Sequence, residues 1–231
     1  AGPAIVEERE STTVIGPGQI SFWYRNYERS GPPDRPRLDF RIGPPGGWDH
    51  LLEGYETTWT QATFPVPPGP QVLSWSLLRV VFFSPPQDPL LYVYLDSVEF
   101  TPTTIPPQAT FAAWTTAWAV GAQSATSDTD GDGLPLLMEY GSGGLPYTPN
   151  PELLPAATII DDHLTLRVTK AASPTDLRVT VQGSTDLRPD SWSTDSVEIL
   201  EEDSTHLLVR SKKTITEQPS FHLRVHVMRV P

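Results

Sequence analysis

Hydrophobic and polar positions alternate along the first hundred residues, in short runs separated by proline and glycine. Within Gln71–Phe83, the bulky side chains of Leu73, Trp75 and Leu77 alternate with serines, which places them on one face of an extended strand. Short strands between Pro/Gly turns are typical of a β-sandwich or barrel. The clearest predicted strands are Gln19–Tyr24, Arg37–Ile42, Thr58–Phe64, Gln71–Phe83 and Leu90–Phe100, and a turn is predicted at residues 67–70.

The period of the pattern changes after a short Thr/Pro-rich segment that has the composition of a stiff linker. Large side chains then recur at the spacing of one helix face, at Phe111, Trp114, Thr115 and Trp118. This spacing predicts a helix over Phe111–Val120, with Thr110 as its N-cap and Gly121 as its stop. A second short helix is predicted at about Pro135–Tyr140.

Strand-like alternation returns after Pro155 and continues to the end of the chain. The predicted strands are Thr158–Asp161, Leu164–Val168, Leu177–Gln182, Ser196–Glu201, His206–Arg210 and Phe221–Met228. The pattern therefore predicts a mainly β protein, in which two β-sandwich domains at 1–103 and 153–231 are joined by a helical segment at 104–152.

Composition and charge exclude several classes of protein. The 231 residues carry a net charge of -12 with three lysines, so no basic patch is available for nucleic acid, which we do not expect as a partner. The chain has no cysteine and therefore no disulfide or zinc–thiolate site. No apolar run is long enough for a membrane helix, so membrane insertion is not expected. The start at Ala1 suggests a processed chain from which an export signal was removed.

One motif is specific. Residues 128–139 read D-T-D-G-D-G-L-P-L-L-M-E, which matches the calcium loop D-x-D-x-D-G-x5-E at every defining position. The segment 104–152 contains five acidic residues and no basic one, so its carboxylates would repel one another without a cation. Ca²⁺ prefers several oxygen ligands, whereas Mg²⁺ takes fewer from protein, so Ca²⁺ is the predicted cofactor over Mg²⁺ or a solvated acidic turn. The predicted ligands are the carboxylates of Asp128, Asp130, Asp132 and Glu139 and the carbonyl of Leu134.

The loop differs from paired intracellular EF-hands in two respects. Residues 121–127 separate the predicted first helix from the loop, and Pro135 lacks the N–H that would pair two such loops. These features predict a single structural site. Removal of Ca²⁺ from this site should loosen residues 121–150.

Several segments resemble known proteins. Phe111-Ala-Ala-Trp114, the loop through Tyr140, Leu164-Thr-Leu and Val181-Gln-Gly-Ser-Thr-Asp-Leu187 with Trp192 resemble the C-terminal region of large secreted proteins of Verrucomicrobia-type bacteria. The loop itself is similar to dockerin and thrombospondin type 3 calcium loops. Ser21-Phe-Trp-Tyr24, Trp59-Thr-Gln, Leu73-Ser-Trp75 and Leu95-Asp-Ser-Val-Glu-Phe100 resemble a MAM-like or jelly-roll β-sandwich of bacterial surface proteins. The resemblance implies an exported, non-catalytic surface module that binds calcium through the loop residues named above.

Other candidate sites carry weaker signals. Trp48, Tyr55 and Trp59 lie in or beside loops, where they could stack on sugar rings or pack as loop plugs. Asp96 is a candidate for a second cation or for a loop hydrogen bond. A glycosidase would need two carboxylates across a cleft, and no spacing selects a pair among Asp39, Glu53, Glu56 and Glu99, so an enzyme is not predicted.

The function predicted from the sequence is therefore structural. We expect a calcium-stabilised extracellular or cell-surface protein, structural or adhesive, whose partners include copies of itself in a filament or surface layer. The stretch Ala4–Ile15 is strand-like without an obvious hairpin partner, so it could complete the sheet of a neighbouring copy by β-strand exchange. The alternative is a carbohydrate-binding module of a secreted protein that binds polysaccharide.

Overall fold

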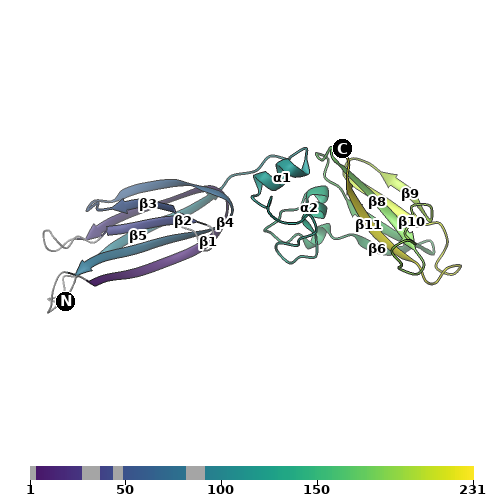
Figure 1. The fold of residues 1–231 in the computed structure, drawn as a ribbon, viewed down its shortest axis with the longest axis horizontal. Helices are drawn as coiled ribbons and strands as arrows, with labels where there is room; N and C mark the ends of the chain where they lie inside the picture. The colour runs from purple at the N-terminus through teal and green to yellow at the C-terminus, as the bar shows by residue number, and fades with distance from the viewer. Residues whose placement is uncertain (1–3, 28–36, 44–48, 82–91) are drawn as a thin grey trace. The chain divides into compact units, whose positions relative to one another are not determined.

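The computed structural model describes residues 4–27, 37–43, 49–81 and 92–231. The protein is mainly β and divides into two compact units, unit 1 at Ala1–Ile105 and unit 2 at Pro106–Pro231 (Figure 1). No helix in the described ranges is long and apolar enough to cross a membrane.

Unit 1 contains a single antiparallel sheet in its described part. Its five strands lie in the order β3-β2-β4-β1-β5. This is fewer than the eight strands of a jelly roll, the topology that the sequence suggested. The strands are β1 (Ala4–Tyr27), β2 (Arg37–Gly43), β3 (Asp49–Gly54), β4 (Thr60–Val81) and β5 (Tyr92–Pro102).

The centre of this sheet is a long ladder between β1 and β4. Pairing runs from Ala4 opposite Val81 to Tyr24 opposite Thr60, with one register shift between Gly16 and Gly18. The predicted turn at residues 67–70 is wrong, because β4 continues through it. The two strands approach closely there, since a Cβ on Gly16 would lie 1.9 Å from the carbonyl oxygen of Pro67.

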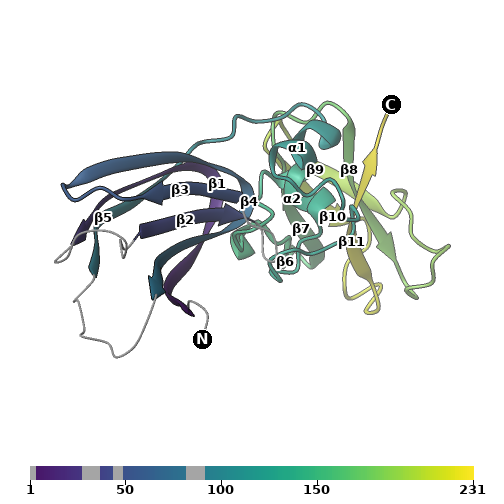
Figure 2. The ribbon, with the colours of Figure 1, turned by 60° about the vertical axis from the view of Figure 1, so that its left-hand side comes forward.

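The hydrophobic core of unit 1 lies between the two halves of this sheet. Phe22 lies in the second half of β1. Its ring centroid is 4.8 Å from that of Phe40 in β2 and 5.7 Å from that of Trp75 in β4. Trp75 is paired with Glu10, in the first half of β1. Because two halves of one strand contribute to facing surfaces, the sheet folds over at its register shift into a sandwich-like arrangement (Figure 2).

Ala4–Ile15, for which the sequence showed no obvious hairpin partner, is paired within its own chain. This stretch pairs with Pro70–Val81 of β4. Its partner is far away in sequence, so no hairpin signal could indicate it. Strand exchange through Ala4–Ile15 would first have to break this ladder, and we therefore abandon that mechanism.

Unit 2 contains two antiparallel sheets around a second core (Figure 1). One has four strands in the order β6-β7-β10-β9, and the other pairs β11 with β8. All six predicted strands are present, with ends shifted by at most two residues. They are β6 (Ala156–Ile160), β7 (His163–Thr169), β8 (Leu177–Ser184), β9 (Val197–Glu202), β10 (His206–Ser211) and β11 (His222–Arg229).

Two short α-helices and a 3₁₀ turn precede these strands and belong to the same unit. They are α1 (Phe111–Ala117), α2 (Leu136–Ser142) and η1 (Pro151–Leu153). The carboxylate of Asp176, just before β8, accepts hydrogen bonds from the Phe111 N–H at 3.0 Å and from the Tyr140 hydroxyl at 2.9 Å. The predicted boundary at 152/153 is thus not a boundary between the two units.

The first helix ends before the predicted stop. Thr110 caps its start by accepting a hydrogen bond from the Ala113 N–H. At the other end, Ala119 adopts a left-handed conformation with φ of 56°, and the N–H groups of Ala119 and Val120 donate to the carbonyls of Thr116 and Thr115. This is the Schellman pattern of helix termination, with alanine in the position that glycine usually takes.

Candidate metal centre

The predicted calcium loop forms a compact cluster of carboxylates. Carboxylate oxygens of Asp128, Asp130 and Asp132 lie within 4.8 Å of one another. Gly133 adopts φ of 92°, a left-handed conformation that lets the chain turn back beneath the aspartates. The loop therefore brings together three of the predicted ligands.

Backbone N–H groups hold these carboxylates in place. Asp128 accepts from the N–H groups of Gly131 at 2.8 Å and Gly133 at 2.9 Å. Asp132 accepts from Leu134 at 2.7 Å and from Asn150 at 2.7 Å, so the segment after α2 also reaches the loop. Because each aspartate oxygen has a second lone pair, these bonds leave capacity for a cation.

Glu139 lies in the first turn of α2 and is fully buried. Among the residues that the structure describes, neither of its carboxylate oxygens has a hydrogen-bond partner, and the same is true of the buried Oδ2 of Asp130. Burial, followed by the charges of the three aspartates, raises the pKa of Glu139 to about 8. A buried carboxylate without a partner is unfavourable, so this group needs either a proton or a cation.

Two main-chain hydrogen bonds fix the start of α2, the helix that carries Glu139. The N–H groups of Leu136 and Leu137 donate to the carbonyls of Ser127 at 2.8 Å and Ala125 at 3.0 Å, which joins the start of α2 to the segment before the loop. Leu134 is buried beside them. The main chain therefore bridges the ends of the loop although Pro135 has no N–H to contribute.

The acidic loop is connected to the sheets of unit 2 through the residues that follow Glu139. Tyr140 donates its hydroxyl hydrogen to Asp176, and the Gly141 carbonyl accepts from the Ala171 N–H at 2.7 Å. Burial, and then the hydrogen bond to Asp176, raises the pKa of the Tyr140 hydroxyl, which keeps it protonated as a donor. These hydrogen bonds join the residues after Glu139 to the segment before β8.

The aromatic residues proposed for glycan binding have different surroundings. Trp48 lies outside the described residues, and no ring contact of Tyr55 is found within them. Trp59 is exposed and lies 6.5 Å from the ring of Tyr94, with the guanidinium of Arg25 over both rings. Arg25 and Tyr94 were not predicted as site residues, although each lies on the outward-facing side of its strand between more buried neighbours.

The remaining acidic candidates do not form a described site. Asp96 accepts hydrogen bonds from the N–H and hydroxyl of Ser97, and within the described ranges it belongs to no acidic cluster of metal-binding size. Asp39 is buried and forms an ion pair with Arg41 at 2.6 Å. The side chain of Glu53 lies outside the described residues, while Glu56 and Glu99 are exposed.

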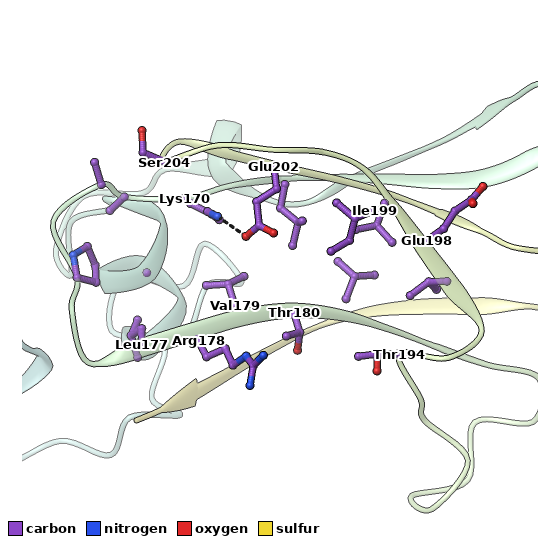
Figure 3. A pocket seen from close by; sticks show the side chains of 18 of the residues that line it. Lys170, Leu177, Arg178, Val179, Thr180, Thr194, Glu198, Ile199, Glu202 and Ser204 are labelled. Atoms are coloured by element: carbon purple, nitrogen blue, oxygen red, sulfur yellow. Dashed lines mark hydrogen bonds and ion pairs between the residues drawn. The ribbon is translucent and has the colours of Figure 1, made fainter. Parts of the chain in front are cut away.

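A groove of about 730 Å³ opens between β8 and β9 in unit 2. Val179 and Thr180 of β8 face Glu198 and Ile199 of β9 across it, and the ion pair of Lys170 with Glu202 lies at one end (Figure 3). Its floor includes core residues of unit 2, namely Val181, Val197, Leu207 and Val209. We interpret it as the open side of the packed sheets.

No protein-family model matches this chain, and no curated protein sequence is significantly similar to it.

Proposed function

We propose that the protein is a non-catalytic, calcium-stabilised structural or adhesive module of the cell surface or extracellular medium. In this proposal, the helix–calcium loop–helix segment is part of unit 2 and precedes its strands. The observation that carries it is the carboxylate of Glu139, which is fully buried, has no hydrogen-bond partner among the described residues, and has its pKa raised by burial and by the charges of the three aspartates.

The donor set favours calcium. Four carboxylates and the Leu134 carbonyl offer the hard oxygen ligands that Ca²⁺ prefers, and Glu139 can supply two oxygens. Extracellular modules bind Ca²⁺ with dissociation constants of about 10⁻⁴–10⁻³ M, so even a modest site is filled outside the cell. This supports an extracellular location.

A structural role follows from the connections of the loop. Asp132 is bonded to Asn150, and the residues after Glu139 are bonded to Asp176 and Ala171. A bound cation would therefore fix α2 against the sheets of unit 2, and its removal would loosen residues 121–150.

Calorimetric titration with CaCl₂, and melting in Ca²⁺ and in EGTA, test this proposal. We expect one bound Ca²⁺ per chain and, at a hundredfold excess over the dissociation constant, a stabilisation of about 2.7 kcal/mol. Absence of binding heat together with identical melting curves in the two buffers would refute the calcium site. MgCl₂ at the same concentration is the matched control and should stabilise less.

Self-association is the second part of the proposal. Light scattering and negative-stain imaging in Ca²⁺ and in EGTA will measure it, and regular polymers that dissolve in EGTA are the expected result. Particles of single-chain mass in both buffers would reject a filament or surface-layer role.

The alternative role is that of a carbohydrate-binding module. It is favoured by the exposed ring of Trp59, which has the ring of Tyr94 and the guanidinium of Arg25 beside it.

A further inference from the structure

The outer face of β1 and β5 carries a group of exposed aromatic residues around one arginine. We call this group, made of Trp23, Arg25, Trp59, Tyr92 and Tyr94, the aromatic platform. Each of the four aromatic side chains exposes between 39% and 44% of its surface. Large exposed apolar patches on a protein surface commonly mark binding sites.

Strand geometry explains why these side chains share a face. In β1, Trp23 and Arg25 alternate with Phe22 and Tyr24, which are buried in the core of unit 1. Arg25 is paired with Tyr94 across the β1–β5 ladder. The platform is therefore the outer surface of a layer whose inner surface is the hydrophobic core.

The platform is held together by ring contacts. The guanidinium carbon of Arg25 lies 5.0 Å from the ring centroid of Trp59 and 4.8 Å from that of Tyr94. The Tyr92 and Tyr94 rings are 6.2 Å apart. Cation–π contacts at these distances orient the guanidinium before any ligand arrives.

Arg25 has no carboxylate partner in the described part of the chain. Its Nε is buried and has no hydrogen-bond partner there. A guanidinium is always charged and presents a planar fork of donors that matches a carboxylate. A cation that is oriented by aromatic rings and has no anion among the described residues is suited to bind an anionic group of a ligand.

We propose that the aromatic platform binds a polysaccharide that contains carboxylate-bearing sugars, with sugar rings stacked on Trp59 and Tyr94 and a sugar carboxylate bound to Arg25. The positive C–H edges of a sugar ring pack on the negative face of an aromatic ring. Densely sulfated polymers fit less well, because the chain carries a net charge of -12 and Asp96 and Glu99 lie further along β5.

The proposal deepens the carbohydrate-binding alternative and does not depend on calcium binding, because the platform lies in unit 1 and the calcium loop in unit 2. It also differs from the site expected from the sequence. Of the predicted Trp48, Tyr55 and Trp59, the aromatic platform contains only Trp59, and its other residues come from β1 and β5.

Affinity electrophoresis of the full chain through gels containing polygalacturonate, alginate or hyaluronate tests the proposal, with dextran and galactan as neutral controls. We expect retardation by at least one acidic polymer and none by the neutral ones. Arg25→Gln and Trp59→Ala should each weaken the affinity about tenfold. Tyr55→Ala, which removes an exposed aromatic ring outside the platform, is the matched control and should change nothing.

Three results would overturn the proposal. They are the absence of retardation by every acidic polymer, retardation that survives both platform substitutions, and binding to neutral polymers alone. A wild-type dimer that Trp59→Ala dissociates in light scattering would instead assign the platform to a second copy of the chain. Calcium titration of the same variants keeps the outcomes separate, because Ca²⁺ affinity should be unchanged in all of them.

Discussion

The calcium loop and the aromatic platform are assembled in opposite ways. All the predicted ligands of the loop lie between residues 128 and 139, and backbone N–H groups of the same segment orient its three aspartates. The platform instead joins residues of β1, of β5 and of the segment before β4. One site needs a local turn and the other needs a completed sheet, so damage to the core should affect them differently.

The largest expected effect comes from Phe22→Ala in the core of unit 1. Phe22 is fully buried against Phe40 and Trp75, so its truncation should destabilise unit 1 by about 3–5 kcal/mol. Scanning calorimetry should show a lower melting temperature for unit 1, together with loss of polysaccharide retardation. Calcium titration should be unchanged, and an equal loss of Ca²⁺ affinity would contradict the independence of the sites. Val98→Ala, at an exposed position, is the control.

Glu139→Gln tests the predicted calcium site in unit 2 without changing the core of unit 1. The substitution removes a predicted ligand, so the calcium-dependent stabilisation of about 2–3 kcal/mol should disappear. In EGTA, the variant should melt above the wild type, because a neutral amide replaces a buried carboxylate. Melting curves in both buffers measure the two effects. Glu152→Gln, at an exposed position near the loop, should behave like the wild type in each.

The pH dependence of stability should differ with and without calcium. The pKa of Glu139 is raised from 4.5 to about 8 in the folded protein, so the folded state retains a proton that the unfolded state has lost. In EGTA, the stability of unit 2 should therefore fall as the pH rises from about 4.5 to about 8. Ca²⁺ should weaken this dependence by displacing the proton. Melting in EGTA that does not change across this range would contradict the burial of an unpaired carboxylate.

The smallest effect is expected at the end of α1. Ala119→Gly removes the strain of a left-handed alanine and should stabilise unit 2 by about 0.5–1 kcal/mol in chemical denaturation. Gly121→Ala is the matched control, because Gly121 has no positive φ and open space around it, and it should be neutral or slightly stabilising. A clear loss of stability in Gly121→Ala, together with no gain in Ala119→Gly, would mean that the helix stops where the sequence suggested.

The parts of the fold that depend on nearby residues could be predicted from the sequence. The strands of unit 2 and the N-cap Thr110 follow from alternation and capping within a few positions. The spacing of the loop likewise indicated which carboxylates would cluster, and the three aspartates do lie together.

Features that depend on distant pairing were missed. The short strand β3 was not predicted, and the first half of β1 was predicted as strand-like but without its partner, the distant strand β4. Prolines between residues 65 and 70 read as a turn, yet β4 bends through them along β1. The spacing of Trp23 and Arg25, and of Tyr92 and Tyr94, places each pair on one face of its strand and is visible in the sequence. The pairing of β1 with β5, which brings the two pairs together, is not.

The β1–β4 ladder also sets the order in which the chain can fold. Ala4 pairs with Val81, so this ladder closes a loop that contains most of unit 1, whereas β6–β7 and β9–β10 are hairpins between neighbouring strands. Non-local pairing is slow because the entropy of loop closure is lost before contacts compensate for it. During synthesis, the backbone N–H and C=O groups of β1 therefore remain without their β4 partners until β4 has been made. Unit 1 should be the slower of the two units to refold.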